Sequence, residues 1–349
     1  MSFYDLAEKA LKLEREGKKI IRLNVGDTNM PTPQCVLDAA IDNLNEKKTD
    51  YGSSAGLPEL REKIAKREGC GIENVVIGPG SKHILYGLLT VLAKKGEKVT
   101  IPTPAWPAYE MICKQLGLET VMVRTEMENN WHFETLDLKN SKMCIICNPA
   151  NPTSNVYSQK CIDDVIKNAK EKECHLILDE AYKAIAFEKI PRYEGAIRVR
   201  SFSKEFNIAN WRLGYAIAPA DVAKKLIAYN QINITCVPPF VQMGGIACLE
   251  NEKELITENL KVWKARSKAA QKALKNAGFE FVTPDAGIYV FATHEKITHA
   301  GEYAHKLLDN GVAIAPGGVF GGYERHFRIC INQDEETLED AVGIMTEEL

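Results

Sequence analysis

The sequence predicts an α/β protein in which a large domain, built on a mainly parallel sheet covered by helices, is joined to a smaller α+β domain. Three observations predict this fold. Between about residues 70 and 218, short apolar runs alternate with segments of helical periodicity, which is typical of parallel sheets with helices on their faces. Residues 251–277 then form one long, alanine-rich helical segment with charges on one side. Beyond it, four short apolar runs surround one more helical segment, which indicates a mixed domain.

Individual helices and strands are predicted from the spacing of apolar residues and from the Gly, Pro and polar residues that interrupt it. Apolar residues spaced three and four apart predict helices at 1–9, 34–44, from 57 onward, 81–94, 162–172, 221–229, 251–277 and 301–310. Apolar runs bounded by Gly, Pro or polar clusters predict strands at 20–25, 75–77, 98–101, 119–124, 143–147, 175–179, 196–199, 213–217, 279–282, 287–291, 312–315 and 325–330. We expect residues 41–236 to form the large domain, and residues 1–40 with 237–349 to form the small domain and its N-terminal segment.

Composition narrows the class of protein. The net charge of −3 gives no reason to expect nucleic acid or an anionic membrane as a partner, and no apolar run is long enough to span a bilayer. Cys144 and Cys147 are spaced like a redox or zinc pair, but they lie in an apolar run with no second pair and no neighbouring histidine. We therefore expect buried free thiols, no metal site, and a reducing compartment, the cytoplasm.

One polar stretch stands between two apolar runs and indicates a binding site. Ser201-Phe202-Ser203-Lys204 is followed eight residues later by Arg212, and the flanking runs suggest a strand, a turn and a return strand. An amine beside two hydroxyls and a guanidinium suits a cofactor that carries an aldehyde and a phosphate. For a single motif of this kind, an ordinary surface loop is the alternative explanation.

Other candidates follow the ends of predicted strands. Gly80-Ser81-Lys82 forms a glycine turn at the start of a helix, where free amides and the helix dipole favour an anion. Trp106 lies in a proline-rich loop beyond a strand and could stack on a flat ring. Asp179 ends an apolar strand, where a carboxylate is costly unless a cation or hydrogen bonds match it, and Tyr182 follows three residues later.

Taken together, these motifs resemble the fold-type I aminotransferases that use pyridoxal 5′-phosphate, in the class I/II family of aspartate, aromatic and histidinol-phosphate aminotransferases. The resemblance extends from Gly26 to Arg328. Three motifs carry it: Asn148-Pro149-x-Asn151-Pro152-Thr153, Asp179-Glu180-Ala181-Tyr182, and Ser201-Phe202-Ser203-Lys204 followed by Trp211-Arg212-x-Gly214-Tyr215. It implies fold type I, pyridoxal 5′-phosphate as the cofactor, and an enzyme.

The resemblance also implies catalytic roles. Lys204 would hold the cofactor as an imine and then move the proton at the substrate α-carbon. Asp179 would pair with the pyridine nitrogen and keep it protonated, so that the ring accepts electrons. Tyr182 and Asn151 would hydrogen-bond the ring oxygen, and Trp106 would stack on the ring.

Binding roles follow from the same resemblance. The phosphate would be held by the turn at Gly80, Ser81 and Lys82, by Ser201 and Ser203, and by Arg212. Tyr51 would reach that phosphate from a second subunit, which implies a homodimer with shared active sites. The substrate carboxylate would be held by Arg328, Asn151 and the backbone near Gly26.

The function implied is transfer of an amino group between an L-amino acid and a 2-oxo acid, such as 2-oxoglutarate, by a ping-pong mechanism. A lyase or decarboxylase on the same fold is the first alternative, and a non-catalytic sensor that retains the cofactor fold is a remote one. A nicotinamide dehydrogenase is excluded because no glycine fingerprint follows a first strand. For the substrate side chain, Trp106, Tyr109, Ile288 and Phe320 could line an apolar pocket, and 236–239 offers no second cation.

Overall fold

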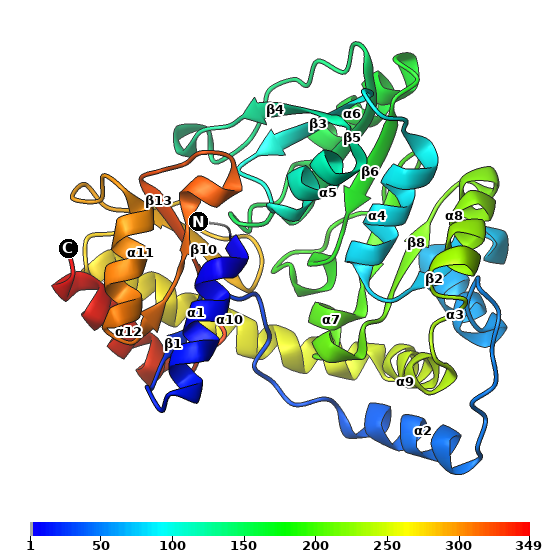
Figure 1. Cartoon of the computed structure of the whole chain (residues 1–349), viewed down its shortest axis with the longest axis horizontal. Helices are drawn as coiled ribbons and strands as arrows, with labels where there is room; N and C mark the ends of the chain where they lie inside the picture. Colours follow the sequence, from blue (N-terminus) through cyan, green and yellow to red (C-terminus); the bar gives the residue numbers. More distant parts are fainter. Residues whose placement is uncertain (1–2) are drawn as a thin grey trace.

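The computed structural model describes residues 3–349, which form two lobes (Figure 1). The larger lobe contains a sheet whose strands lie in the order β2-β8-β7-β6-β5-β3-β4. These strands are β2 (Val75–Gly78), β3 (Lys98–Thr103), β4 (Glu119–Arg124), β5 (Ser141–Cys147), β6 (His175–Asp179), β7 (Ile197–Ser201) and β8 (Gly214–Ile217). All neighbours are parallel except β8, which is antiparallel to both β2 and β7. The predicted mainly parallel sheet is confirmed.

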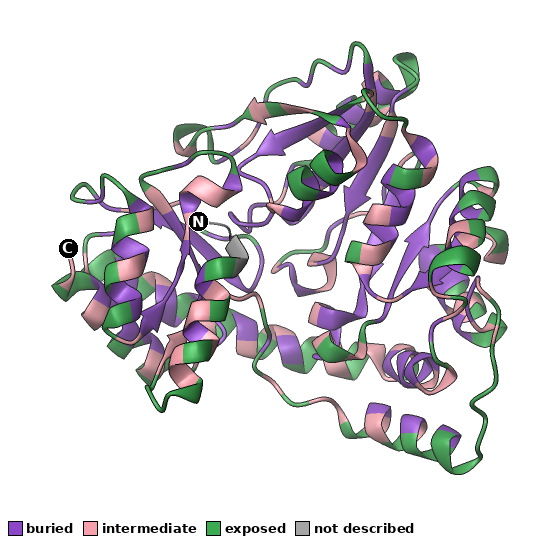
Figure 2. Cartoon of the chain, viewed as in Figure 1, coloured by how far each residue is buried: buried purple, intermediate pink, exposed green. Residues whose placement is uncertain are grey.

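The central strands are buried on both faces, as Figure 2 shows, because helices cover each side of the sheet. Alternate residues point to opposite layers. Ile145 and Ile177 pack with one set of helices, while Ile146 and Leu178 pack against the other layer. The first layer contains α4 (Ser81–Leu92), α5 (Ala108–Leu116) and α8 (Ala220–Asn233), and the second contains α6 (Gln159–Glu171). This two-sided burial explains why β5 and β6 are nearly continuous apolar runs in the sequence.

The smaller lobe contains an antiparallel sheet in the order β12-β13-β10-β9, and a separate parallel pair, β1 with β11. Its strands are β1 (Ile21–Arg22), β9 (Glu280–Phe281), β10 (Tyr289–Thr293), β11 (Val312–Ala313), β12 (Ala315–Pro316) and β13 (His326–Cys330). They pack with α1 (Phe3–Arg15), α11 (Ala300–Asp309) and α12 (Glu335–Glu347). The predicted α+β character is confirmed, whereas the domain boundaries remain a prediction.

The remaining helices border or link the two lobes. They are α2 (Gln34–Asn45), α3 (Pro58–Glu68), α7 (Phe202–Glu205), α9 (Pro239–Glu250) and α10 (Glu252–Asn276), with short 3-10 turns at Ile72–Asn74, Met127–Asn129, Lys183–Ile185, Ala209–Trp211 and Gly317–Phe320. The long helix α10 runs from the smaller lobe to a position beneath α7 (Figure 1). Asn259 of α10 donates a hydrogen bond to the backbone oxygen of Glu205, at 2.7 Å. This contact ties α7 to the helix that joins the lobes.

Several predicted elements differ from the structure. The turn expected after residue 201 is the short helix α7, and the strand expected at 312–315 is two strands that pair with different partners. The helices α5, α9 and α12 were not predicted. The predicted first helix is present from residue 3 as α1, and its first two residues lie outside the described residues. No helix within residues 3–349 has the length and apolar character needed to cross a membrane.

The cysteine prediction is confirmed in part. All ten cysteines are free thiols, and Cys144 is fully buried in the core. Cys147 differs, because it lies at the end of β5, lines a cavity, and its thiol donates a hydrogen bond to the backbone oxygen of Pro149 at 3.1 Å.

Candidate active site

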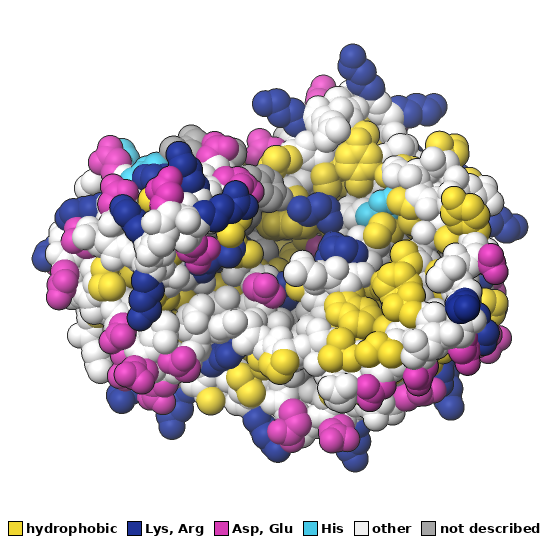
Figure 3. Space-filling model, turned by 60° about the horizontal axis from the view of Figure 1, so that its bottom comes forward, with side chains coloured by type: hydrophobic (Ala, Val, Ile, Leu, Met, Phe, Trp, Pro, Cys, Tyr) yellow, Lys and Arg dark blue, Asp and Glu magenta, His cyan; other side chains and the backbone are white. Residues whose placement is uncertain are grey.

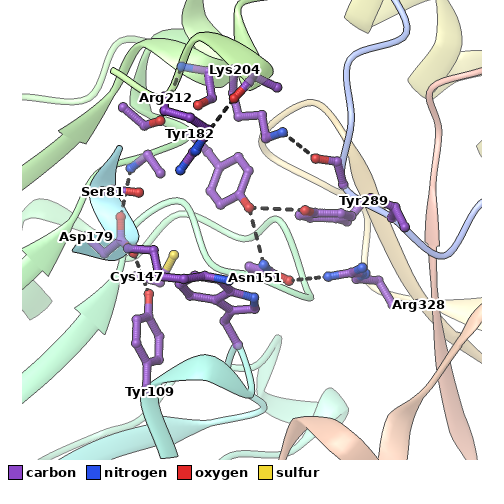
Figure 4. A pocket seen from close by; sticks show the side chains of 18 residues that line it. Ser81, Tyr109, Cys147, Asn151, Asp179, Tyr182, Lys204, Arg212, Tyr289 and Arg328 are labelled. Carbon is purple, nitrogen blue, oxygen red and sulfur yellow. Dashed lines mark hydrogen bonds between the residues drawn. The ribbon is translucent and has the colours of Figure 1, made fainter. Parts of the chain in front are cut away.

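A cavity of about 260 Å³ opens at the carboxyl ends of β5, β6 and β7, between the two lobes. Figure 3 shows a hollow on one face of the molecule with Lys and Arg side chains inside it, and Figure 4 shows the cavity from close by. The predicted site residues that line it are Gly26, Ser81, Lys82, Trp106, Asn151, Asp179, Tyr182, Ser201, Ser203, Lys204, Arg212 and Arg328. The fold therefore brings together residues from distant parts of the sequence, as expected for the ends of parallel strands.

Asp179 is the buried acid of the cavity, with 3% of its surface exposed. The hydroxyl of Tyr109 donates to Oδ2 at 2.7 Å, and the amide of Ala181 donates to Oδ1 at 3.1 Å. Burial raises the pKa of Asp179 to about 6, although these two hydrogen bonds act in the opposite direction. Within residues 3–349 no basic side chain forms an ion pair with it, and no cation contributes to its pKa. A cationic ring nitrogen at this position would supply the missing positive charge.

Lys204 is the amine of the cavity and projects from α7, with its Nζ donating to the backbone oxygen of Gly26 (Figure 4). Burial lowers the pKa of Lys204; Asp27 opposes this, and the positive charges of Arg212 and Arg328 add to it. The environment therefore favours the neutral, nucleophilic amine. Local geometry supports α7, because Ser201 caps it by accepting a hydrogen bond from the amide of Ser203 at 3.2 Å.

One end of the cavity is suited to an anion. Helix α4 begins at Ser81, so its first amides face this end together with the guanidinium of Arg212 and the hydroxyl-bearing residues Ser201 and Ser203. Gly80 does not line the cavity itself but shapes the turn. Its φ is +84°, and an added Cβ would lie 2.2 Å from Nη2 of Arg212. The donors present here fit a phosphate group.

The opposite end carries a buried guanidinium. Arg328, on β13, is 1% exposed and donates from Nη1 to Oδ1 of Asn151 at 2.9 Å and from Nη2 to the backbone oxygen of Asn24 at 2.6 Å. Asn151 in turn donates to the hydroxyl of Tyr182 at 3.2 Å. Burial raises the pKa of Tyr182. These contacts connect the carboxylate-binding candidate to the ring-binding candidates through one chain of polar groups.

Three lining residues with polar or titratable side chains were not given these places from the sequence, namely Tyr109 as the partner of Asp179, Cys147 and Tyr289. The hydroxyl of Tyr289 lies 3.1 Å from that of Tyr182, and its ring lies 4.2 Å from the guanidinium of Arg328. It also explains Gly26, since an added Cβ there would lie 1.7 Å from the Tyr289 hydroxyl. No local signal identifies Tyr289, because it occupies an ordinary strand position.

The remaining candidates are placed as follows. Of the four residues expected to form an apolar pocket, Trp106 and Tyr109 line the cavity. Ile288 is instead buried in the core of the smaller lobe. Phe320 lies outside the lining, with its ring 5.0 Å from the Arg328 guanidinium. Tyr51 does not line the cavity and is 88% exposed. Its predicted role in a second subunit remains a prediction.

Comparison with known proteins agrees with this geometry. The family model described as aminotransferase class I and II matches residues 18–344. An aspartate aminotransferase from Thermococcus kodakarensis is 32% identical, with 94% of this chain and 88% of that protein covered. One from Pyrococcus abyssi is 30% identical, with 94% and 91% covered.

Solved structures agree as well. The aspartate aminotransferase of Thermus thermophilus with maleate has a TM-score of 0.95 at 26% identity and covers 100% of this chain and 97% of its own. That of Thermotoga maritima has a TM-score of 0.93 at 25% identity, with 99% and 96% covered. The family predicted from the sequence is thus confirmed: this chain belongs to the aminotransferase class I and II family and is an enzyme that transfers amino groups.

Proposed function

We propose that the enzyme uses pyridoxal 5′-phosphate, bound in the cavity between the lobes, to move an amino group from an L-amino acid to a 2-oxo acid such as 2-oxoglutarate in a ping-pong reaction. The observation that carries the proposal is the placement of Asp179 and Lys204 on one cavity. The acid lacks a cationic partner within residues 3–349, and burial favours the neutral form of the amine. An anion-binding end and a buried arginine border the same cavity.

When bound, pyridoxal phosphate supplies an aldehyde for covalent attachment and a ring that withdraws electrons from the substrate α-carbon. Lys204 would attach to the aldehyde, and its amine, once released, would carry the proton at the α-carbon. Asp179 would hold the ring nitrogen in its protonated form, because the carboxylate gains the counter-charge that it otherwise lacks. Trp106 would lie against the ring face.

The polar groups at each end would fix the orientation of cofactor and substrate. Ser81, Ser201, Ser203 and Arg212 would hold the phosphate, with Gly80 and the Lys82 amide completing the turn. Tyr182 and Asn151 would bind the ring oxygen. Arg328 would bind the substrate α-carboxylate in a bidentate manner, beside Asn151 and the backbone of Gly26.

We further propose that the preferred substrates are dicarboxylates, as the names of the aspartate aminotransferase relatives suggest for those proteins. A second carboxylate calls for a second cation. Lys82 supports this proposal, because its side chain lines the cavity with Nζ lying 5.1 Å from the centre of the Trp106 ring. Replacing Lys82 with Gln should raise KM for aspartate and 2-oxoglutarate while leaving KM for a monocarboxylic donor such as alanine nearly unchanged.

We also propose that the enzyme is a homodimer and is located in the cytoplasm. The exposure of Tyr51, at 88%, supports this proposal because the side chain is accessible to a second subunit, and Ile41 and Leu44 on α2 are also exposed. The ten free cysteines favour a reducing compartment.

The decisive experiment combines colour, adduct mapping and product analysis. Purified protein supplied with pyridoxal phosphate should turn yellow, and reduction with borohydride followed by peptide mass spectrometry should place the adduct on Lys204. Adding aspartate should remove the yellow absorbance, and 2-oxoglutarate should restore it with formation of glutamate. Release of carbon dioxide or ammonia in stoichiometric amounts, without glutamate, would instead favour a lyase or decarboxylase.

A further inference from the structure

A cluster of buried charges lies on the segments that carry the site, but its side chains do not line the cavity. We call it the charged cluster. It contains the acids Glu68, Glu180 and Glu205 and the bases Arg67, Lys183, Arg198 and Arg200. None of these side chains is more than 13% exposed. None of these side chains lines the cavity. Because burying this many charges is costly, their presence needs a separate explanation.

The charged cluster and the cavity share the same backbone segments. Asp179 lines the cavity, while the next residue, Glu180, belongs to the cluster. The same relation holds for Lys204 and Glu205. Ser201 lines the cavity and follows directly after Arg200. Arg200 and Ser201 alternate along β7, whereas Lys204 and Glu205 are consecutive on α7, where side-chain directions differ by about 100°. In each case a single peptide unit separates the cluster from the cavity, so a displacement in the cluster should reach the cavity.

Arg200 differs from the other bases because it contacts all three acids. Its Nε donates to Oε1 of Glu205 at 3.0 Å, and its Nη2 also binds that oxygen. Its Nη1 lies 3.4 Å from Oε1 of Glu68 and 3.8 Å from Oε2 of Glu180. Among the described residues, Arg200 is thus the base that links the neighbour of Lys204 to the neighbour of Asp179.

Each acid also has a base that does not bind the other two. Arg67 binds Glu205 with both terminal nitrogens at 3.0 Å. Lys183 binds Glu180 at 2.7 Å, and Arg198 binds Glu68 at 2.6 Å. Without Arg200, each of the three acids would therefore still face a base, although Arg67 is shared with the partly exposed Glu252, at 2.5 Å. Loss of Arg200 removes the link between the acids and leaves no carboxylate unpaired.

The helix that carries Lys204 depends on such a link. Helix α7 has only four residues, too few to be stable by its own hydrogen bonds. Its position is set by the cap at Ser201, by the contact from Asn259 to the Glu205 backbone, and by the Glu205 side chain in the charged cluster.

We propose that Arg200 is a positioning residue, which fixes the amine of Lys204 relative to the carboxylate of Asp179. It hydrogen-bonds Glu205 and at the same time attracts Glu180 through an ion pair at 3.8 Å, where the Oε2 atom of Glu180 has no hydrogen-bond partner among the described residues. Its effect on turnover rests on the proposed function, but its effect on α7 does not. A purely stabilising role would not distinguish Arg200 from another buried arginine of the cluster.

Arg198 provides a matched control. It lies two residues earlier on the same strand, its side chain is 5% exposed against 6% for Arg200, and both bind Glu68. No ion pair links it to Glu180 or Glu205 within residues 3–349. Replacing Arg198 with Met removes the same charge and volume but keeps the link, since Glu68 retains Arg200 and the Tyr215 hydroxyl, which donates to it at 2.8 Å.

The first measurement is hydrogen exchange of cofactor-free protein. Amides of residues 202–206 should exchange about tenfold faster or more in Arg200→Met than in wild type, and at the wild-type rate in Arg198→Met. The second is steady-state kinetics of the loaded enzyme. There kcat/KM should fall by about 10²-fold for Arg200→Met alone, the size expected when catalytic groups move by about 1 Å.

The proposal would be overturned if Arg200→Met and Arg198→Met changed the exchange rates and kcat/KM equally. It would also be overturned if the amides of residues 202–206 exchanged at the wild-type rate in Arg200→Met. If Arg200→Met does not fold, Arg200→Lys takes its place, because a point charge cannot span two carboxylates as the guanidinium fork does, and the same direction of change is required. Wild-type protein without aminotransferase activity would refute the proposed function, while the exchange experiment would still decide the role of Arg200.

Discussion

The carboxyl group of Asp179 offers a quantitative test, because the property that suits it to catalysis should destabilise the cofactor-free protein. Replacement by Asn keeps the size of the side chain and an acceptor for one of its two donors, the Tyr109 hydroxyl or the Ala181 amide, while removing the charge. The variant should therefore lack the pH dependence of stability that the buried acid produces.

The size and sign of that dependence follow from the pKa. Burial raises it from 3.8 to about 6, and at about 1.36 kcal/mol per pKa unit this corresponds to about 3 kcal/mol. Because the pKa is higher in the folded state, the contribution to stability is fully present below pH 3.8 and is lost as the pH rises through about 6. Between pH 4 and pH 8, wild type should therefore lose about 2–3 kcal/mol relative to Asp179→Asn, slightly less than the full value because the unfolded-state carboxyl is already partly ionised at pH 4.

The assay is urea unfolding of cofactor-free wild type and Asp179→Asn between pH 4 and pH 8. Subtracting the two free energies at each pH cancels other titrating groups that are unaffected by the substitution. Asp163→Asn, at an exposed position on α6, is the control and should show a flat difference. A flat difference for Asp179→Asn, or a wild type that gains stability relative to the variant as the pH rises, would refute the reasoning.

Other substitutions separate the roles of the remaining site residues. Lys204→Ala should lower kcat by on the order of 10²–10⁴-fold or more and abolish the borohydride-reducible adduct, with cofactor binding partly retained; an unchanged kcat would contradict the assignment. Tyr109→Phe should move the acid limb of the kcat/KM profile to higher pH, because the hydroxyl lowers the pKa of Asp179; an unmoved limb would argue against this contact. Arg328→Lys should raise KM for donor and acceptor by about 10–10²-fold, since bidentate binding is lost, and steady-state kinetics with normal cofactor titration checks this.

Much of the fold could be predicted because the buried strands are apolar runs. The strands at 119–124 and 175–179 have the predicted bounds, and the latter ends in Asp179 as expected. Helix α9 was missed because it is apolar nearly all round and contains Gly244 and Gly245, which usually interrupt helices. In the structure these glycines permit close packing, since added Cβ atoms would lie 2.8 Å from the Trp211 ring and 2.5 Å from a methyl group of Leu213.

Residues that line the cavity could be picked out from the sequence where a local motif carries them, but not where contact between distant segments brings them there. Lys204, Asp179 and Arg212 stand in recognisable local patterns, and all three line the cavity. Tyr289 reaches the site from a strand, and it lies 107 residues after Tyr182 in the sequence. The charged cluster escaped notice for the same reason: Glu68 meets Arg200 across 132 residues, and each reads alone as an ordinary surface charge.

The alternation of side chains at the ends of β6 and β7 has a consequence for changes in chain length. Deleting one residue from His175–Asp179 would turn Glu180 into the cavity and remove it from Lys183 and Arg200, because each step along a strand reverses the side-chain direction. The new acid would be longer by one methylene, and the arginines behind it would lose a counter-ion. Insertions and deletions should therefore not be tolerated in these two strands, where length is constrained as strictly as chemistry.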